Sequence, residues 1–253
     1  MPKSTPVAVD WIVPDWPAPA GVRAVTTTRH GGVSKGCYAS MNPADHVDDA
    51  PPAVAENRQR LLHALTLPAD PVWLQQVHGT AVVDAAAGEP APAADAAFSR
   101  QPGVVCAVLT ADCLPVLLTY TAGDCVAAVH AGWRGLVAGV IEQTVVALAL
   151  PGERLLAWLG PAIGPQAFQV GAEVRDAFLS HDQAAATAFR QGSDGSCYAD
   201  LYHLARLRLA AVEVTAVYGG GLCSFTDSDR FYSYRRDGVT GRMATLIWLE
   251  SQG

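Results

Sequence analysis

The chain has 253 residues and a mass of 26.5 kDa, and 50% of its residues are hydrophobic, which is enough to build one sizeable buried core. Its formal net charge is −7, its sequence pI is about 5.4 and it contains only two lysines, so it lacks the positive field that attracts a nucleic-acid backbone or an anionic membrane. We therefore expect a single domain over residues 1–253, with no nucleic acid and no membrane as a partner.

Short apolar runs bounded by turn residues predict a series of β-strands along the chain. In chain order, strands are expected at residues 22–28, 72–77, 104–109, 114–119, 125–130, 154–159, 214–218 and 243–249.

Helical spacing of apolar residues predicts helices between these strands. The segment at residues 48–65 reads DDAPPAVAENRQRLLHAL; it offers Asp48 and Asp49 as caps and two prolines for a first turn. Further helices are expected at residues 136–150, 172–180 and 199–211. This mixture predicts an α+β or mixed α/β fold.

The stretch at residues 85–98 reads AAAGEPAPAADAAF and is rich in alanine and proline. This composition predicts an exposed loop. Because strand signals resume directly after it, we do not expect a domain linker there.

Nothing in the sequence resembles an export signal or a membrane span. The N-terminal segment has no unbroken apolar stretch, and no later segment approaches the 18 consecutive apolar residues of a transmembrane helix. We expect a cytoplasmic protein whose six cysteines are reduced thiols. No CxxC or HExxH pair occurs, so any metal site must combine residues that are distant in sequence.

Three metal-binding residue types stand where predicted strands give way to loops. His78 follows the run VWLQQV, Cys113 precedes the strand at 114–119, and His130 ends the strand at 125–130. Two imidazoles and one thiolate leave a fourth tetrahedral position open, as in catalytic zinc sites. From spacing alone, a cysteine in an apolar run is also typical of a small buried core residue, so both interpretations stay open.

Arginines and polar loops offer candidate substrate contacts. Arg134 lies in AGWRGL at a predicted strand-to-helix turn, where it would contact an anion or pair with a surface acid. The segment DRFYSYRRDGVTGR, residues 229–242, interleaves four arginines with aromatic rings. That pattern suits a nucleoside with a phosphate, or equally a strand edge with solvated charges. The candidates for substrate binding are Arg29, Asn42, His46, Arg134, Ser233 and Arg235.

Eight short segments occur in order between about residues 22 and 249, and together they resemble a known family. The segments are TTTRHGGVS, ASMNPADHVDD, ENR, QQVHG, TADCLPVLL, VHAGWRGL, GPAIGP and FYSYRRDGVTGRMATLIWL. They are similar to the motifs of the YfiH-type laccase-domain family, also called the purine nucleoside phosphorylase family.

The resemblance implies an α+β fold of mixed β-sheets flanked by helices. It also implies a cytoplasmic enzyme that binds zinc through His78, Cys113 and His130, with copper as the alternative metal. Implied activities are phosphorolysis of adenosine, inosine and methylthioadenosine, with deamination of adenosine to inosine. The expected partners are purine nucleosides and phosphate, and we expect a monomer, with a dimer as the alternative.

Two other enzyme classes stay open at this point. Older descriptions of the family name copper-dependent polyphenol oxidases, but the seven histidines include no HxH pair, and the five left after His78 and His130 are too scattered for a three-copper cluster. A single copper would accept the same ligands. Alternatively, Cys113 would be a nucleophile with His130 or His78 as its base, giving a metal-free thiol hydrolase or amidase.

The two expected reactions make different demands on the site. Phosphorolysis needs cations that hold phosphate, for which Arg29, Arg134 and Arg235 are the candidates. Deamination needs a metal-activated water and a nearby acid or base. Asp112, beside Cys113, is the candidate for that acid or base, because the sequence identifies no suitable glutamate.

Overall fold

The computed structural model describes residues 10–193 and 195–251. Its β-strands are β1 Val22–Thr26, β2 Val82–Asp84, β3 Ala96–Ser99, β4 Val105–Thr110, β5 Leu114–Tyr120, β6 Val126–Ala131, β7 Leu155–Leu159, β8 Gln169–Val170, β9 Phe189–Gln191, β10 Cys197–Ala199, β11 Ala216–Gly219 and β12 Met243–Leu249. Its α-helices are α1 Pro51–Leu65, α2 Trp133–Ala138, α3 Val140–Leu148, α4 Ala172–His181, α5 Leu201–Ala211 and α6 Tyr234–Asp237.

The strands within the described residues form three sheets. The largest has the order β11-β7-β5-β6-β3-β2, with parallel pairs at its two ends and antiparallel pairs between them. A second sheet has the order β1-β12-β4 and is antiparallel, and a small antiparallel sheet has the order β8-β10-β9. The expected α+β fold of mixed sheets flanked by helices is confirmed.

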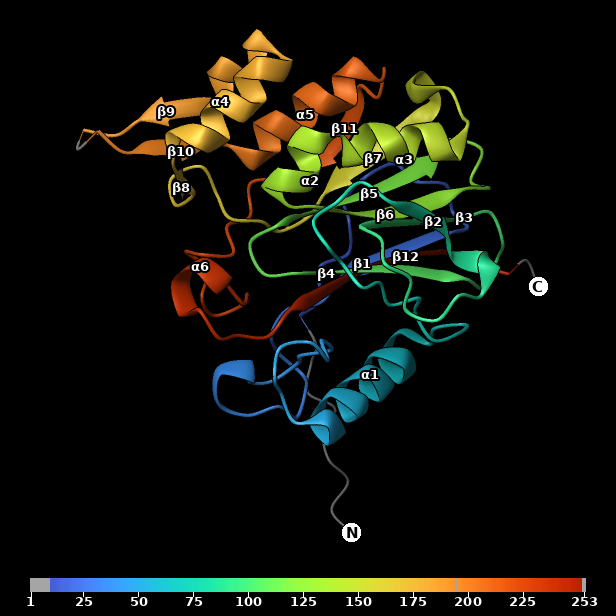
Figure 1. The fold of residues 1–253 in the computed structure, drawn as a ribbon. Helices are drawn as coiled ribbons and strands as arrows, with labels where there is room; N and C mark the ends of the chain where they lie inside the picture. Colours follow the sequence, from blue (N-terminus) through green and yellow to red (C-terminus); the bar gives the residue numbers. More distant parts are fainter. Residues whose placement is uncertain (1–9, 194, 252–253) are drawn as a thin grey trace.

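The two larger sheets pack face to face, and helices cover their outer faces (Figure 1). On β5, Leu117 packs between the sheets, while Val116 and Leu118 pack against the helices. On β12, Ile247 packs between the sheets and Leu246 packs toward the side of α1. Both sheets are therefore buried on both faces, which explains why their strands read as continuous apolar runs in the sequence.

Most predicted strands are confirmed with shifted ends, and β12 has the predicted bounds. The strand expected at 72–77 is wrong: only Val72 forms an isolated bridge, to Cys106. Farther along this segment, the side-chain amide of Gln76 donates to the Leu109 carbonyl at 2.8 Å and accepts from the Leu109 N–H at 2.7 Å. A side chain thus replaces the backbone ladder that a strand would supply.

The exposed loop expected at 85–98 is confirmed for residues 87–91 and 93, which are exposed, and wrong for the end of the stretch. Its last residues form β3, in the interior of the six-stranded sheet, and Ala94, Asp95 and Ala96 are fully buried. Small alanine side chains at 94, 96 and 97 allow close packing between layers, so this last part of the stretch belongs to the core.

The predicted helices at 172–180 and 199–211 are confirmed as α4 and α5, and the helix expected within 48–65 as α1. Its capping is different, because Ala50 is the N-cap and no side chain caps the helix. The single helix expected at 136–150 is two helices, α2 and α3, because Gly139 adopts a left-handed φ of 98° between them. Among the described residues, no helix is both long and apolar enough to cross a membrane.

Candidate active site and metal centre

One end of the six-stranded sheet brings the three predicted metal-binding residues together. Cys113 directly precedes β5, and His130 lies near the end of β6, where it pairs with Pro115 of β5. Because these strands are antiparallel neighbours, the start of one lies beside the end of the other. His78 reaches the same place from the loop before β2.

The donor atoms of His78, Cys113 and His130 all lie within 4.8 Å of one another. The Cys113 sulfur is 3.7 Å from Nε2 of His78, and the two imidazole rings meet edge to face with centroids 4.7 Å apart. Imidazole nitrogen and thiolate sulfur are ligands that zinc prefers, so this donor set fits a zinc ion. His130 is buried, Cys113 is half-buried and His78 is exposed, so the group opens toward solvent on one side.

A fully buried carboxylate, Asp95, holds two of these three residues in place. Its Oδ1 is 2.8 Å from Nδ1 of His130 and accepts the backbone N–H of His78 at 2.9 Å. Its Oδ2 accepts the backbone N–H groups of Val77 at 3.2 Å and Gly79 at 2.6 Å. With Nδ1 of His130 engaged by the carboxylate, Nε2 is the nitrogen left for a metal, as in carboxylate–histidine–zinc arrangements.

The backbone around the group adopts conformations that need such support. His78 has a φ of 58° and Asp112 a φ of 94°, which are left-handed values that cost a non-glycine residue about 1–3 kcal/mol. The Asp112 carboxylate accepts the Ser224 hydroxyl at 2.6 Å and the Arg235 N–H at 2.7 Å. These hydrogen bonds fix the turn that presents Cys113.

Two glycines of the HAGWRG motif allow the segments to approach. A Cβ on Gly132 would lie 2.8 Å from Cδ2 of His78 and 3.1 Å from the Cys113 sulfur. A Cβ on Gly135 would lie 2.8 Å from the carbonyl oxygen of Gly79. Neither position leaves room for a side chain, so the start of α2 packs closely against the His78 loop only because both positions are glycine.

Charge interactions inside the group favour a thiolate and an imidazolium. Burial opposes ionisation of Cys113, but the charge of His130 and hydrogen bonds from both imidazoles outweigh it and lower the pKa of Cys113 to about 6. Burial also opposes a charge on His130, yet the Cys113 thiolate and Asp95 raise the pKa of His130 to about 9. The pKa of Asp95 is lowered, because hydrogen bonds from His130 and Gly79 overcome the effect of burial. A thiolate at neutral pH is the form that binds a metal.

The group opens into a cavity of about 370 Å³. Besides His78, Cys113 and His130, its polar wall contains His46, Gln76, Thr110, Tyr234 and Arg242. Burial, and then the charge of Arg242, lower the pKa of His46, so its imidazole is neutral at pH 7. The Tyr234 side chain is 62% exposed at the cavity. The wall therefore combines one arginine, one neutral imidazole and one aromatic ring.

Of the six residues predicted to bind substrate, His46 lies on the cavity wall. Asn42 is fully buried behind the wall, where its Oδ1 accepts the backbone N–H of Arg242 at 3.0 Å. Ser233 is also buried, and its hydroxyl accepts the N–H of Arg236 at the start of α6. Asn42 and Ser233 thus hold backbone segments in the structure.

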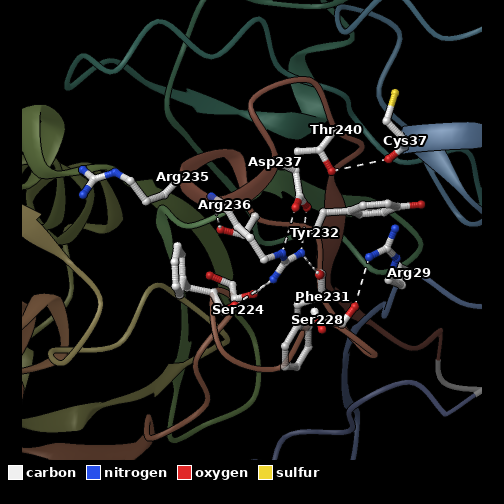
Figure 2. A network of polar contacts seen from close by, with 12 residues as sticks. Arg29, Cys37, Ser224, Ser228, Phe231, Tyr232, Arg235, Arg236, Asp237 and Thr240 are labelled. Atoms are coloured by element: carbon white, nitrogen blue, oxygen red, sulfur yellow. Dashed lines mark hydrogen bonds and ion pairs between the residues drawn. The ribbon is translucent and has the colours of Figure 1, made fainter.

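The three predicted arginines make other contacts. Arg29 donates to the carbonyls of Ala39 and Ser228, and Arg134 lies over the ring of Trp133. Arg235 donates to the Gln169 carbonyl, and Figure 2 shows its side chain extending away from the network around Arg236. Contacts of these arginines with substrate stay predictions.

The sequence reasoning did not single out Asp95, Gln76 or Thr110, and it named Arg242 only as one of a cluster. Asp95 lies in the alanine-rich stretch at 85–98, which was expected to be a loop. A usable signal was the lone acid directly before the apolar residues of β3, because a carboxylate at the start of a buried strand needs several hydrogen-bond donors.

Comparisons with known proteins agree on one family. Residues 23–250 match the family model described as "Multi-copper polyphenol oxidoreductase laccase". A Pseudomonas aeruginosa protein named as a purine nucleoside phosphorylase is 56% identical over 243 residues, covering 95% of this chain and 98% of that protein. The Escherichia coli purine nucleoside phosphorylase YfiH is 56% identical over 240 residues, covering 94% and 98%. A crystal structure of a Neisseria meningitidis protein, 50% identical, superposes with a TM-score of 0.92 and covers 96% of this chain and 100% of that one.

Proposed function

Because the chain belongs to the YfiH-type laccase-domain family, we propose that it is a zinc-dependent purine nucleoside phosphorylase that also deaminates adenosine. The proposed substrates are adenosine, inosine and methylthioadenosine, together with phosphate. The observation that carries the proposal is the group of His78, Cys113 and His130 at the open side of a nucleoside-sized cavity.

The proposed metal ligands are Nε2 of His78, the sulfur of Cys113 and Nε2 of His130. A zinc ion held there would act as a Lewis acid that polarises a substrate oxygen or activates water. Asp95 keeps the Nδ1 proton of His130 occupied and so directs the free electron pair of Nε2 toward the other two donors. Copper is the alternative occupant, because the same ligand types bind it.

The cavity wall offers contacts for both halves of a nucleoside. Its volume of about 370 Å³ lies within the range of small-molecule sites. The exposed ring of Tyr234 is placed to stack on a purine, and the neutral imidazole of His46 is placed to exchange a hydrogen bond with the sugar or the base. In phosphorolysis, a phosphate oxygen bonds to the sugar carbon as the bond to the purine nitrogen breaks, which yields free base and ribose 1-phosphate.

Deamination of adenosine consumes water and releases ammonia, so a group near the purine must accept and return a proton. Among the described residues, the cavity wall contains no carboxylate. The carboxylate of Asp112, the candidate from the sequence, is already engaged by Ser224 and Arg235. We assign the proton transfer to His46, whose lowered pKa keeps it neutral and able to accept a proton.

Two alternative functions are separated by metal content. A multicopper oxidase needs a second metal cluster. Residues 10–193 and 195–251 include all seven histidines and all six cysteines, yet they contain one group of three or more side chains that could hold a metal. A thiol hydrolase is favoured by one observation, the lowered pKa of Cys113, which also suits a nucleophile. A bound metal would block that role.

The decisive experiment incubates zinc-loaded protein with inosine or adenosine, with and without phosphate, and measures products by chromatography. Phosphate-dependent release of hypoxanthine or adenine is expected, and its absence would rule out the phosphorylase. Formation of inosine from adenosine without phosphate is expected, and its absence would rule out the deaminase. Hydrolysis of amides or thioesters by metal-free protein would instead favour the thiol hydrolase.

We further propose a cytoplasmic, monomeric enzyme that acts as one domain. One family model matches residues 23–250, which supports a single catalytic unit. Size-exclusion chromatography with light scattering tests the monomer against the dimer.

A further inference from the structure

Thr110 carries an unpaired hydroxyl on the wall of the cavity. The residue is 1% exposed, and its Oγ1 is buried without a hydrogen-bond partner among the described residues. Other buried threonines are satisfied: Thr119 donates to the Cys125 carbonyl at 3.1 Å and Thr144 to the Val140 carbonyl at 2.7 Å. Since an unpaired buried hydroxyl destabilises a folded protein, the exception at Thr110 points to a ligand that completes its hydrogen bonding.

Strand alternation places the Thr110 side chain in the same space as the metal-binding group. On β4, Val108 packs between the two large sheets, and Thr110, two residues later, has its side chain on the same face. On β6, Ala128 packs between the sheets, and His130, two residues later, also shares that face. Thr110 and His130 therefore point into the same intersheet space from opposite sheets, at the end where the cavity opens.

Arg242 stands beside Thr110 on the same wall. Thr110 pairs with Met243 across β4 and β12, and Arg242 is the residue before Met243. One guanidinium nitrogen, Nη1, donates to the carbonyls of Thr240 and Gly241 at 2.9 and 3.0 Å, which fixes the group. Nε and Nη2 of Arg242 make no hydrogen bond within the described part of the chain, so these donors stay available for a ligand.

We propose that the Thr110 hydroxyl and the Arg242 guanidinium form an oxyanion subsite that holds inorganic phosphate during phosphorolysis. This assignment rests on the proposed phosphorylase function. A guanidinium with free N–H groups binds phosphate oxygens in a forked geometry, and a hydroxyl supplies a further donor from the side. Within the described residues, no carboxylate lines the cavity to compete for the guanidinium.

The subsite places the nucleophile beside the metal-binding group. A phosphate oxygen forms the bond to C1′ of the nucleoside, the bond from C1′ to the purine nitrogen breaks, and its electron pair leaves with the purine. The proton of hydrogen phosphate ends on the purine nitrogen, so the products are neutral base and ribose 1-phosphate. Deamination does not use phosphate and so does not need this subsite.

The test is Thr110→Val, which removes the hydroxyl and keeps the shape of the side chain. The KM for phosphate should rise about 10-fold or more, because a hydrogen bond to an anion is lost, while the KM for inosine and the rate of adenosine deamination stay within about 2-fold. Arg242→Lys should raise the KM for phosphate further, because a point charge replaces the fork. An unchanged phosphate KM in both variants, or a rise in the inosine KM instead, would overturn the subsite.

Stability supplies a second readout with a matched control. Thr110→Val should leave the midpoint of urea unfolding unchanged or raised, because the hydroxyl has no partner among residues 10–193 and 195–251 to lose. Thr144→Val removes a hydroxyl that bonds to Val140 on α3, away from the cavity, so it should lower the midpoint and leave the phosphate KM unchanged. A lowered midpoint for Thr110→Val would show that the hydroxyl serves the fold, which contradicts the proposal.

Direct binding separates failure of the subsite from failure of the proposed function. Phosphate binding to the zinc-loaded protein is measured by calorimetry for the natural chain and for both variants. If the natural chain releases no base but binds phosphate, and the variants bind it weakly, the phosphorylase proposal fails and the subsite stands. If the natural chain does not bind phosphate, the subsite is wrong.

Discussion

Two arginines six residues apart, Arg236 and Arg242, show how the molecule separates scaffold from function. Arg236 uses all five of its N–H donors, on the carbonyls of Ser224, Phe225 and Phe231 and on both oxygens of Asp237 (Figure 2). Arg242 lines the cavity, and within the described residues only its Nη1 forms hydrogen bonds, to two carbonyls. Both lie in the same arginine-rich segment, so composition alone does not distinguish them. The difference indicates that unpaired donors, and not arginines as such, identify the proposed subsite.

The largest effect is expected from removing Cys113, the proposed metal ligand that lines the cavity. Cys113→Ala should abolish zinc binding and both activities, because one of three ligands is lost. Metal content after dialysis and release of hypoxanthine from inosine measure this. Cys197→Ala is the matched control, since that thiol lies on β10, away from the cavity, and its metal content should equal that of the natural chain. Full zinc occupancy in Cys113→Ala would contradict the proposed centre.

Arg236→Ala tests whether Arg236 stabilises the fold. Three carbonyls and one carboxylate lose their partner, so the free energy of unfolding should fall by about 2–4 kcal/mol, measured by urea denaturation. Zinc affinity should stay within about 3-fold, because Arg236 contacts none of the proposed ligands. A large loss of zinc affinity with little change in stability would reverse the assignment of Arg236 to the scaffold.

Asp95 is both paired within the protein, like Arg236, and in contact with residues of the candidate metal site. Asp95→Asn keeps the shape but replaces an acceptor oxygen by an N–H donor, so zinc affinity should fall about 10–100-fold, measured by competition with a chelating dye. Asp200→Asn makes the same chemical change at the N-cap of α5 and should leave zinc affinity unchanged.

A spectroscopic readout sharpens the Asp95 prediction. In zinc-loaded natural protein, nitrogen NMR should find His130 protonated at Nδ1, where Asp95 accepts the proton. A proton on Nε2 would contradict both the role of Asp95 and the proposed ligand atom.

The smallest expected effect is a shift in the pH dependence of Cys113. In metal-free protein, its alkylation by iodoacetamide should be slow below pH 6 and rise to a plateau above it, because the thiol becomes a thiolate at a pKa of about 6. In Asp95→Asn, the midpoint should move upward, because a weaker imidazolium stabilises the thiolate less. Alkylation that rises only near pH 9 in the natural chain would show that the ion pair does not form.

The sequence predicted those parts of the fold that depend on local pattern. Strand β12 was predicted with its observed bounds because a strand buried on both faces reads as one apolar run. The group of His78, Cys113 and His130 was also predicted, from residues at strand ends and from the family motifs. Both signals can be recognised within a few residues of the chain.

The parts that the sequence did not predict depend on contacts between distant segments. The segment at 72–77 is apolar enough for a strand, but the side chain of Gln76 bonds to Leu109 in place of a ladder. Asp95 lies in a stretch that resembles a loop, and its burial follows from the pairing of β3 with β6. That the Thr110 hydroxyl has no partner in the described part of the chain can be seen only once the surrounding segments are in place.

The carboxylate of Asp95 affects how the proposed metal would bind. Because it holds the His78 loop and the His130 ring through hydrogen bonds within the protein, two of the three donors are positioned by the fold itself. The loss of conformational entropy needed to order these donors therefore occurs on folding. In a zinc finger, by contrast, the chain folds only when it binds its ion. A metal bound there would therefore enter a site that the fold already provides, and its removal should leave the fold intact.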